Sequence, residues 1–254
     1  MSTEFDLNNE DFEAELHAME GMIASLESTG SGRTPPRARV VGANAAVLFL
    51  AATFEEFVRQ QVKSVFSHRA SAAATVDELS PKLAAVVWRK SLDQLARSDV
   101  ADWVLDTSGL SARLDSIIRF CVGKDVSADV GDVLAHNEQN LRPAELGKLF
   151  NQVGLKSIVA KAAEFPALMH FLGCETPGKS DAELQSRLEG FFIRRNEIAH
   201  AIRLNASSGP PTLATDIQMF RLFASGITAA CATHCGLQAH ARHTAEAPEN
   251  SEGA

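Results

Sequence analysis

Three polar residues suited to handling an RNA phosphate fall within six positions of each other: Arg195, Asn196 and His200. Arginine stays charged, and its planar guanidinium matches two phosphate oxygens. Histidine, with an unperturbed pKa of ~6.5, accepts or donates a proton near neutral pH. RNA supplies its own nucleophile, because removal of the 2′-hydroxyl proton lets that oxygen attack the adjacent phosphorus. These residue types suit metal-independent RNA cleavage, in which Asn196 could position either partner by hydrogen bonding.

The three residues belong to one long predicted helix. Ser180 and Glu183 have the spacing of a capping box, which predicts the helix start. A stripe of apolar residues then recurs at helical spacing: Leu184, Leu188, Phe191, Ile198 and Ile202. Arg194 and Arg203 flank the three polar residues and are predicted to support them.

Helical geometry separates Arg195 from His200. At ~100° per residue, five steps place their side chains about 140° apart, so one helix does not readily point both at one phosphate. Two such helices meeting across a two-fold axis would surround one groove with two arginines and two histidines. We therefore predict a homodimer joined through residues 180–203.

The segment Arg195-Asn196-Glu197-Ile198-Ala199-His200 resembles the motif of the HEPN superfamily, which is an arginine, a polar residue and a histidine near the end of a long helix. Residues 52–59, with Glu55 before an aromatic residue, resemble the early helix of that family. A short segment around 149–159 between these helices is most similar to the RiboL-PSP type. The resemblance spans roughly residues 45–237. It implies an all-α HEPN-like helical bundle with additional inserted helices, and an endoribonuclease with a composite site at a dimer interface.

Several alternatives stay open. Glu55 or Glu56 could orient an arginine of the motif helix by a charge-assisted hydrogen bond, or both could simply be exposed. Arg195 and His200 could instead be helix-end residues that interact with the helix dipole. Many HEPN-like domains bind RNA, a nucleotide or a protein partner without cutting. An unregulated ribonuclease is toxic, so toxin, antiviral defence and RNA-processing roles, with a regulatory protein or antitoxin as partner, are all compatible with the resemblance.

The negative charge of the chain is concentrated at its beginning. Residues 1–27 hold eight Asp and Glu and no Lys or Arg, which leaves 24 acidic against 24 basic residues elsewhere. This segment is also a predicted amphipathic helix, with its apolar stripe at Phe12, Leu16, Met19, Ile23 and Leu26. Either the acidic helix restrains RNA binding by occupying arginines, or it packs permanently with its acids facing water.

The predicted organisation has four parts. These are an acidic helix at 1–28, a Gly/Pro/Arg loop at 29–39, the HEPN-like domain at 40–239 and a disordered tail at 240–254. The loop contains Arg33, Arg37 and Arg39, which are candidates for RNA phosphate contacts. A solvated linker, or one paired with the acidic helix, is the alternative.

Further helices are predicted from apolar periodicity and from proline and serine caps. They cover residues 45–66, 80–96, 99–122, 126–136, a stretch opening at Pro143, 156–172 with an interruption at Pro166, and 213–237. No β-hairpin or βαβ pattern appears.

Other kinds of site find little support. Cys231, His234 and Cys235 lack the spacing of a structural zinc site and are interpreted as core residues, so no metal is predicted. The sequence has no phosphate-binding glycine loop, and no cofactor is predicted. Four cysteines without framework spacing suit a reducing cytoplasm. No apolar run approaches the ~18 residues of a membrane span, so no membrane partner is predicted.

Overall fold

The computed structural model describes residues 2–28, 36–80, 82–97, 107–137, 141–200 and 210–237, and these residues form helices and no strand. The prediction of an all-α fold is confirmed. The helices in chain order are α1 (Glu4–Ser28), α2 (Pro36–Ala72), α3 (Val76–Leu79), α4 (Leu83–Arg97), α6 (Thr107–Cys121), α7 (Gly131–Ala135), α8 (Pro143–Gln152), α9 (Ile158–Ala163), α10 (Pro166–Phe171), α11 (Pro177–His200) and α12 (Pro210–His234). The predicted tail at 240–254 lies outside the described residues.

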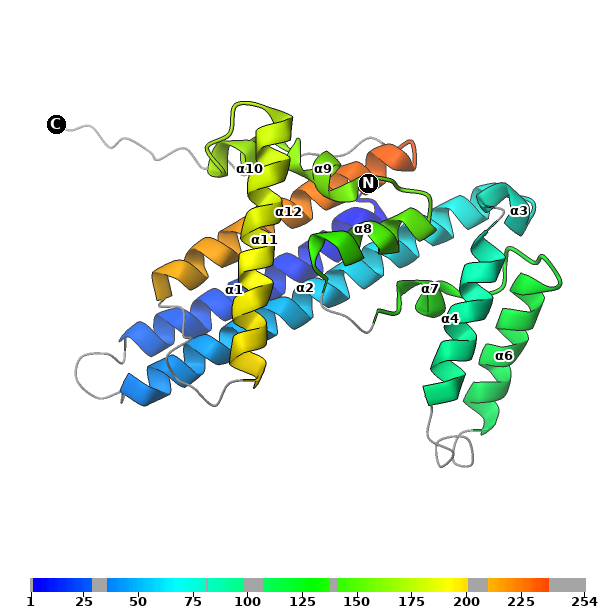
Figure 1. Cartoon of the computed structure of the whole chain (residues 1–254), viewed down its shortest axis with the longest axis horizontal. Helices are drawn as coiled ribbons and strands as arrows, with labels where there is room; N and C mark the ends of the chain where they lie inside the picture. The colour runs from blue at the N-terminus through cyan, green and yellow to red at the C-terminus, as the bar shows by residue number, and fades with distance from the viewer. Residues whose placement is uncertain are drawn as a thin grey trace.

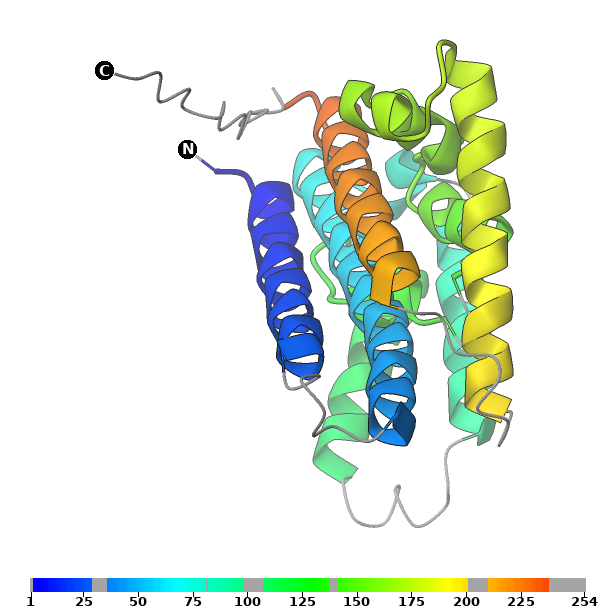
Figure 2. The same cartoon turned by 90° about the vertical axis from the view of Figure 1, so that its left-hand side faces the viewer.

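Two long helices, α2 and α12, form the centre of the bundle with α1 beside them, and α11 crosses these helices at a steep angle (Figure 1). Turned by 90°, the molecule shows α1 on one side of α2 and α12, and α11 on the other (Figure 2). Helices α4 and α6 project as an arm away from α11. The acidic helix and the motif helix are therefore separated by the two central helices.

The predicted inner faces of the central helices are buried. On α2 these residues are Val47, Leu50, Phe54, Phe57, Val58, Val62 and Val65, and on α12 they are Ile217, Phe220, Phe223, Ala224 and Ile227. Each set recurs every three to four residues, which places it on one side of a helix. Pro143 and Pro166 begin α8 and α10, where the lost N–H costs nothing.

Helices α2 and α11 begin earlier than predicted, and α7 begins later, at Gly131 instead of residue 126. Helix α2 begins at Pro36, inside the predicted 29–39 loop, because proline fits the first turn of a helix. Helix α11 begins at Pro177, so Ser180 lies inside the helix and does not cap it. The buried Ser180 hydroxyl instead donates to the Ala163 carbonyl at 2.8 Å, and Glu183 accepts from Arg187 at 2.7 Å.

One described helix, α2, is long and apolar enough to satisfy a length-and-composition test for membrane spans, over Arg39–Ala72. Its position accounts for that composition. Its apolar face is covered by α1, α7, α11 and α12 at the centre of the bundle. Most large apolar residues of α2 thus form a protein core, although Val41 and Phe49 are exposed, and one helix of this kind is weak evidence for membrane insertion.

Candidate functional site

Phenylalanine packing holds the motif helix against the centre of the bundle. Phe191 of α11 meets Phe220 of α12 edge-on at 4.7 Å between ring centroids, and Phe220 contacts Phe54 of α2 at the same distance. Phe192 is also fully buried. Aromatic pairs of this geometry add specific attraction to their buried area. This contact fixes α11 one turn before the predicted site residues.

Arg195 and Asn196 lie together on α11. The Arg195 Nη1 donates to the Asn196 Oδ1 at 3.3 Å, and both residues are partly buried. The Arg195 Nε is buried and forms no hydrogen bond. The arginine is thus held in place while part of its donor capacity stays unused.

Glu55 of α2 lies within range of the Arg195 charge, where α2 and α11 pack together. Burial raises the pKa of Glu55, and the charges of Arg195 and Arg59, together with the backbone N–H of Leu141, oppose that rise. The Oε1 of Glu55 is buried without a hydrogen-bond partner. The structure therefore brings Glu55 close to Arg195, whereas Glu56 is exposed and accepts from Gln60 and Arg59 on its own helix.

His200 is the last residue of α11, and its side chain is exposed. Ile198, two positions earlier, is turned into the core, which leaves the histidine on the outer surface. The axial rise from Arg195 to His200 is ~7.5 Å, with the two side chains on different sides of the helix. Within one chain the structure does not bring Arg195 and His200 together.

A profile of the RiboL-PSP-HEPN family matches residues 16–228 of the chain. The chain belongs to this family. The match confirms the predicted HEPN superfamily domain and, with the helical structure, its HEPN-like fold. No curated protein and no solved structure showed significant similarity to the chain.

Arg194 of this HEPN domain points away from Arg195, as successive helix positions do. Its Nη2 lies 2.9 and 2.7 Å from the two carboxylate oxygens of Asp216 on α12. Burial raises the pKa of Asp216, and Arg194 opposes that rise. Arg194 therefore joins α11 to α12, and Arg203 lies outside the described residues.

The loop arginines of the HEPN domain do not gather at the motif. Arg37 and Arg39 are exposed on the first turn of α2, and Arg33 lies outside the described residues. Sixteen residues separate Arg39 from Glu55, which is about 24 Å along the helix. Any contact of Arg37 or Arg39 with RNA would therefore be remote from Arg195 in the same chain.

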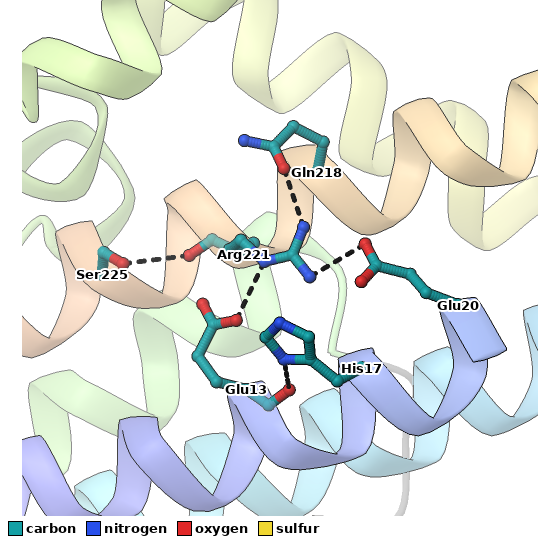
Figure 3. Close-up of polar contacts among 6 residues, drawn as sticks. All are labelled: Glu13, His17, Glu20, Gln218, Arg221 and Ser225. Atoms are coloured by element: carbon teal, nitrogen blue, oxygen red, sulfur yellow. Dashed lines mark hydrogen bonds and ion pairs between the residues drawn. The ribbon is translucent and has the colours of Figure 1, made fainter. Parts of the chain in front are cut away.

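The acidic helix α1 is joined to α12 by one arginine (Figure 3). Arg221 donates from Nε to Glu13 and from Nη2 to Glu20, each at 2.9 Å, and from Nη1 to Gln218 at 2.8 Å. It is 19% exposed. The apolar stripe of α1 also enters the core through Phe5, Phe12, Leu16 and Met19. This arrangement favours the permanent packing of α1, with two of its acids on Arg221 and away from α11.

The cysteine cluster on α12 has the properties of core thiols. Cys231 is fully buried, and burial raises its pKa well above the usual value. Burial also raises the pKa of Cys235, against the opposing charge of Arg69. Within the described ranges no group of three His, Cys, Asp or Glu side chains is placed to hold a metal ion.

Sequence reasoning missed Asp216 and Arg221. A signal for both was present, because they are the only acidic and the only Lys or Arg residue of α12. An isolated charge near a buried helix face requires a partner from elsewhere. The sequence does not say which partner.

Proposed function

We propose that this HEPN domain is a metal-independent endoribonuclease whose catalytic residues are Arg195, Asn196 and His200. The supporting observation is that a family-matched fold joins Arg195 to Asn196, with Glu55 in range of the Arg195 charge, while His200 stays exposed at the end of the same helix. RNA is the substrate class, because this chemistry needs a 2′-hydroxyl.

In the proposed mechanism, His200 transfers the proton. It removes the 2′-hydroxyl proton or protonates the leaving 5′-oxygen, while the Arg195 guanidinium stabilises the charge that develops on the phosphate. Asn196 orients Arg195 through their hydrogen bond. In this proposal Glu55 orients Arg195 through their opposite charges. The products would carry 2′,3′-cyclic phosphate ends.

The proposed site is composite and forms between two copies of the chain. The separation of Arg195 from His200 on one helix supports this arrangement. So does Ile193, which is 48% exposed and lies seven residues before His200 on the same side of α11. An exposed apolar side chain beside a polar candidate site suits an interface. A regulatory partner and a cytoplasmic role as toxin, antiviral effector or processing enzyme belong to the same proposal.

The experiment is incubation of the purified chain with total RNA, with and without a chelator. Wild type should cleave in both conditions and His200→Ala should not, with end analysis showing cyclic phosphates. His170→Ala is the matched control, because His170 is exposed on α10 away from the motif. Activity of His200→Ala, or 5′-phosphate products, would contradict the mechanism.

A non-catalytic role in binding RNA, a nucleotide or a protein is the second candidate. The observation that favours it is the engagement of Arg195 within its own chain, with Asn196 and Glu55. In that case the wild-type chain would bind RNA without shortening it.

A further inference from the structure

A hollow of about 310 Å³ lies between α11 and α12. Its polar lining consists of Ser186, Arg187 and Arg194 from α11 and of Thr215 and Asp216 from α12. This volume is at the small end of ligand sites. It suits a ligand of one ring system better than a complete nucleoside triphosphate.

The hollow combines a buried acceptor with two cations. Asp216 is only 8% exposed and accepts from Arg194. Arg187 also acts on this carboxylate through its charge. Each carboxylate oxygen offers two acceptor sites, so Asp216 keeps capacity for further donors.

The Arg194 guanidinium has hydrogen-bond donors that Asp216 does not use. Its Nη2 binds Asp216, and within the described residues its Nη1 forms no hydrogen bond. The guanidinium lies over the Phe191 ring at 5.9 Å, which restricts its orientation. The Nη1 is 3.8 Å from the position that a Cβ on Gly190 would take. A side chain at residue 190 would therefore project toward the unused donor.

These groups select the chemistry of the ligand. A free anion would be repelled by the buried carboxylate of Asp216, and a cation would be repelled by Arg187 and Arg194. A neutral ring with donors next to an acceptor would suit both kinds of group. The Watson–Crick edge of guanine has this pattern, with N1–H and N2–H₂ beside O6. Proteins read unstacked RNA bases through such contacts to that edge.

We propose that this hollow is a subsite for a guanine base of single-stranded RNA, with Asp216 accepting from N1 and N2 and Arg194 donating to O6. It rests on the proposed ribonuclease function and adds a base preference to it. Arg194 and His200 are six residues apart, which is about 9 Å along α11 and about 120° around its axis. A base held at Arg194 could therefore belong to a nucleotide whose phosphate lies near the end of the helix.

The test uses nucleosides, which carry no phosphate and so do not report on the motif arginines. Titration calorimetry of the full chain should show guanosine binding at least tenfold more tightly than adenosine, cytidine or uridine, and no binding of inorganic phosphate at this hollow. Gly190→Leu should fill the hollow and remove guanosine binding. Gly178→Leu, on the exposed first turn of the same helix, is the matched control and should bind as wild type does.

Asp216→Asn and His200→Ala separate a guanine subsite from the proposed ribonuclease activity. Asp216→Asn should lose the guanosine preference at least tenfold and also tests the subsite if Gly190→Leu does not fold. His200→Ala should keep guanosine binding while losing RNA cleavage. Equal affinity for all nucleosides, or guanosine binding unchanged in folded Gly190→Leu or Asp216→Asn, would overturn the subsite. If the wild-type chain binds guanosine but does not cleave RNA, the ribonuclease proposal is rejected and the guanine subsite is retained. If it cleaves RNA but does not bind guanosine, the guanine subsite is rejected and the ribonuclease proposal is retained.

Discussion

The charge of Arg195 on α11 acts on the Glu55 carboxylate of α2, where two helices separated by more than a hundred residues in sequence pack together. Burial raises the pKa of Glu55 even though Arg195 and Arg59 favour its charged form. Burial therefore raises the free energy of the ionised carboxylate by more than the charges of Arg195 and Arg59 lower it. Such a cost is typical of a residue held in place for a purpose other than stability.

A pH dependence of stability follows from Glu55. Because its folded pKa is raised above the unfolded value, its stabilising contribution is present at low pH and is lost as pH rises through the folded pKa. The Glu55→Gln variant has no ionisable group at this position and so does not lose stability in this way. The free energy of unfolding of the variant, relative to that of wild type, should therefore increase between pH 4.5 and pH 7. Urea unfolding across this range measures the effect, with Glu56→Gln as the exposed control. A pH-independent difference would contradict the assignment.

The composite site predicts rescue between two inactive chains. Arg195→Ala and His200→Ala should each be inactive alone. In a mixed dimer one chain contributes His200 and the other Arg195, so the mixture should recover part of the cleavage rate. Sedimentation at micromolar concentration should give twice 27.3 kDa. A fully active monomer, or a dimeric mixture with no recovery, would reject the shared site.

Removal of α1 should unfold the domain. Four side chains of α1 are buried in the core: Phe5, Phe12, Leu16 and Met19. Their burial contributes roughly 6–12 kcal/mol, counted at 1.5–3 kcal/mol each, which is comparable with the whole stability of about 5–15 kcal/mol of a typical domain. Deletion of residues 2–27 should therefore abolish cooperative thermal unfolding. A folded truncated chain that binds RNA more tightly at low salt would instead support the restraint hypothesis.

Arg221 should contribute to the docking of α1 through charge. Arg221→Gln removes its ion pairs with Glu13 and Glu20 and should lower the free energy of unfolding by roughly 1–3 kcal/mol. Salt screens partly exposed pairs, so the loss should shrink as ionic strength rises. Urea unfolding of wild type and variant at 0.05 and 1 M salt compares the two. An equal loss at both concentrations would assign the effect to packing.

Ser180 should matter as a tertiary hydrogen-bond donor. Ser180→Ala leaves the Ala163 carbonyl without this donor and should cost about 1–3 kcal/mol of stability. Ser71→Ala, whose hydroxyl is exposed on α2, is the control and should change stability by less than about 0.5 kcal/mol. Equal effects of the two substitutions would show that the Ala163 contact contributes nothing.

The sequence alone was sufficient for the presence of the long helices and for their buried faces, but not for where each helix begins. The apolar residues of α2 and α12 recur with the helical period, and burial of an apolar stripe requires no knowledge of which helix covers it. The same locality made the family motif readable, because Arg195, Asn196 and His200 are neighbours in the chain. It also placed Arg195 and His200 on different sides of one helix.

The tertiary structure decided which charges meet. Ser180 and Glu183 match a local capping pattern, but Ser180 bonds to Ala163, and Pro177 starts the helix earlier. Arg194 and Arg195 are adjacent, yet one meets Asp216 of α12 and the other faces Glu55 of α2. The period of a helix is a local property, whereas the partner of a buried charge depends on how distant helices cross. The local sequence pattern therefore determined which segments form helices, and the packing of those helices determined which charged side chains become partners.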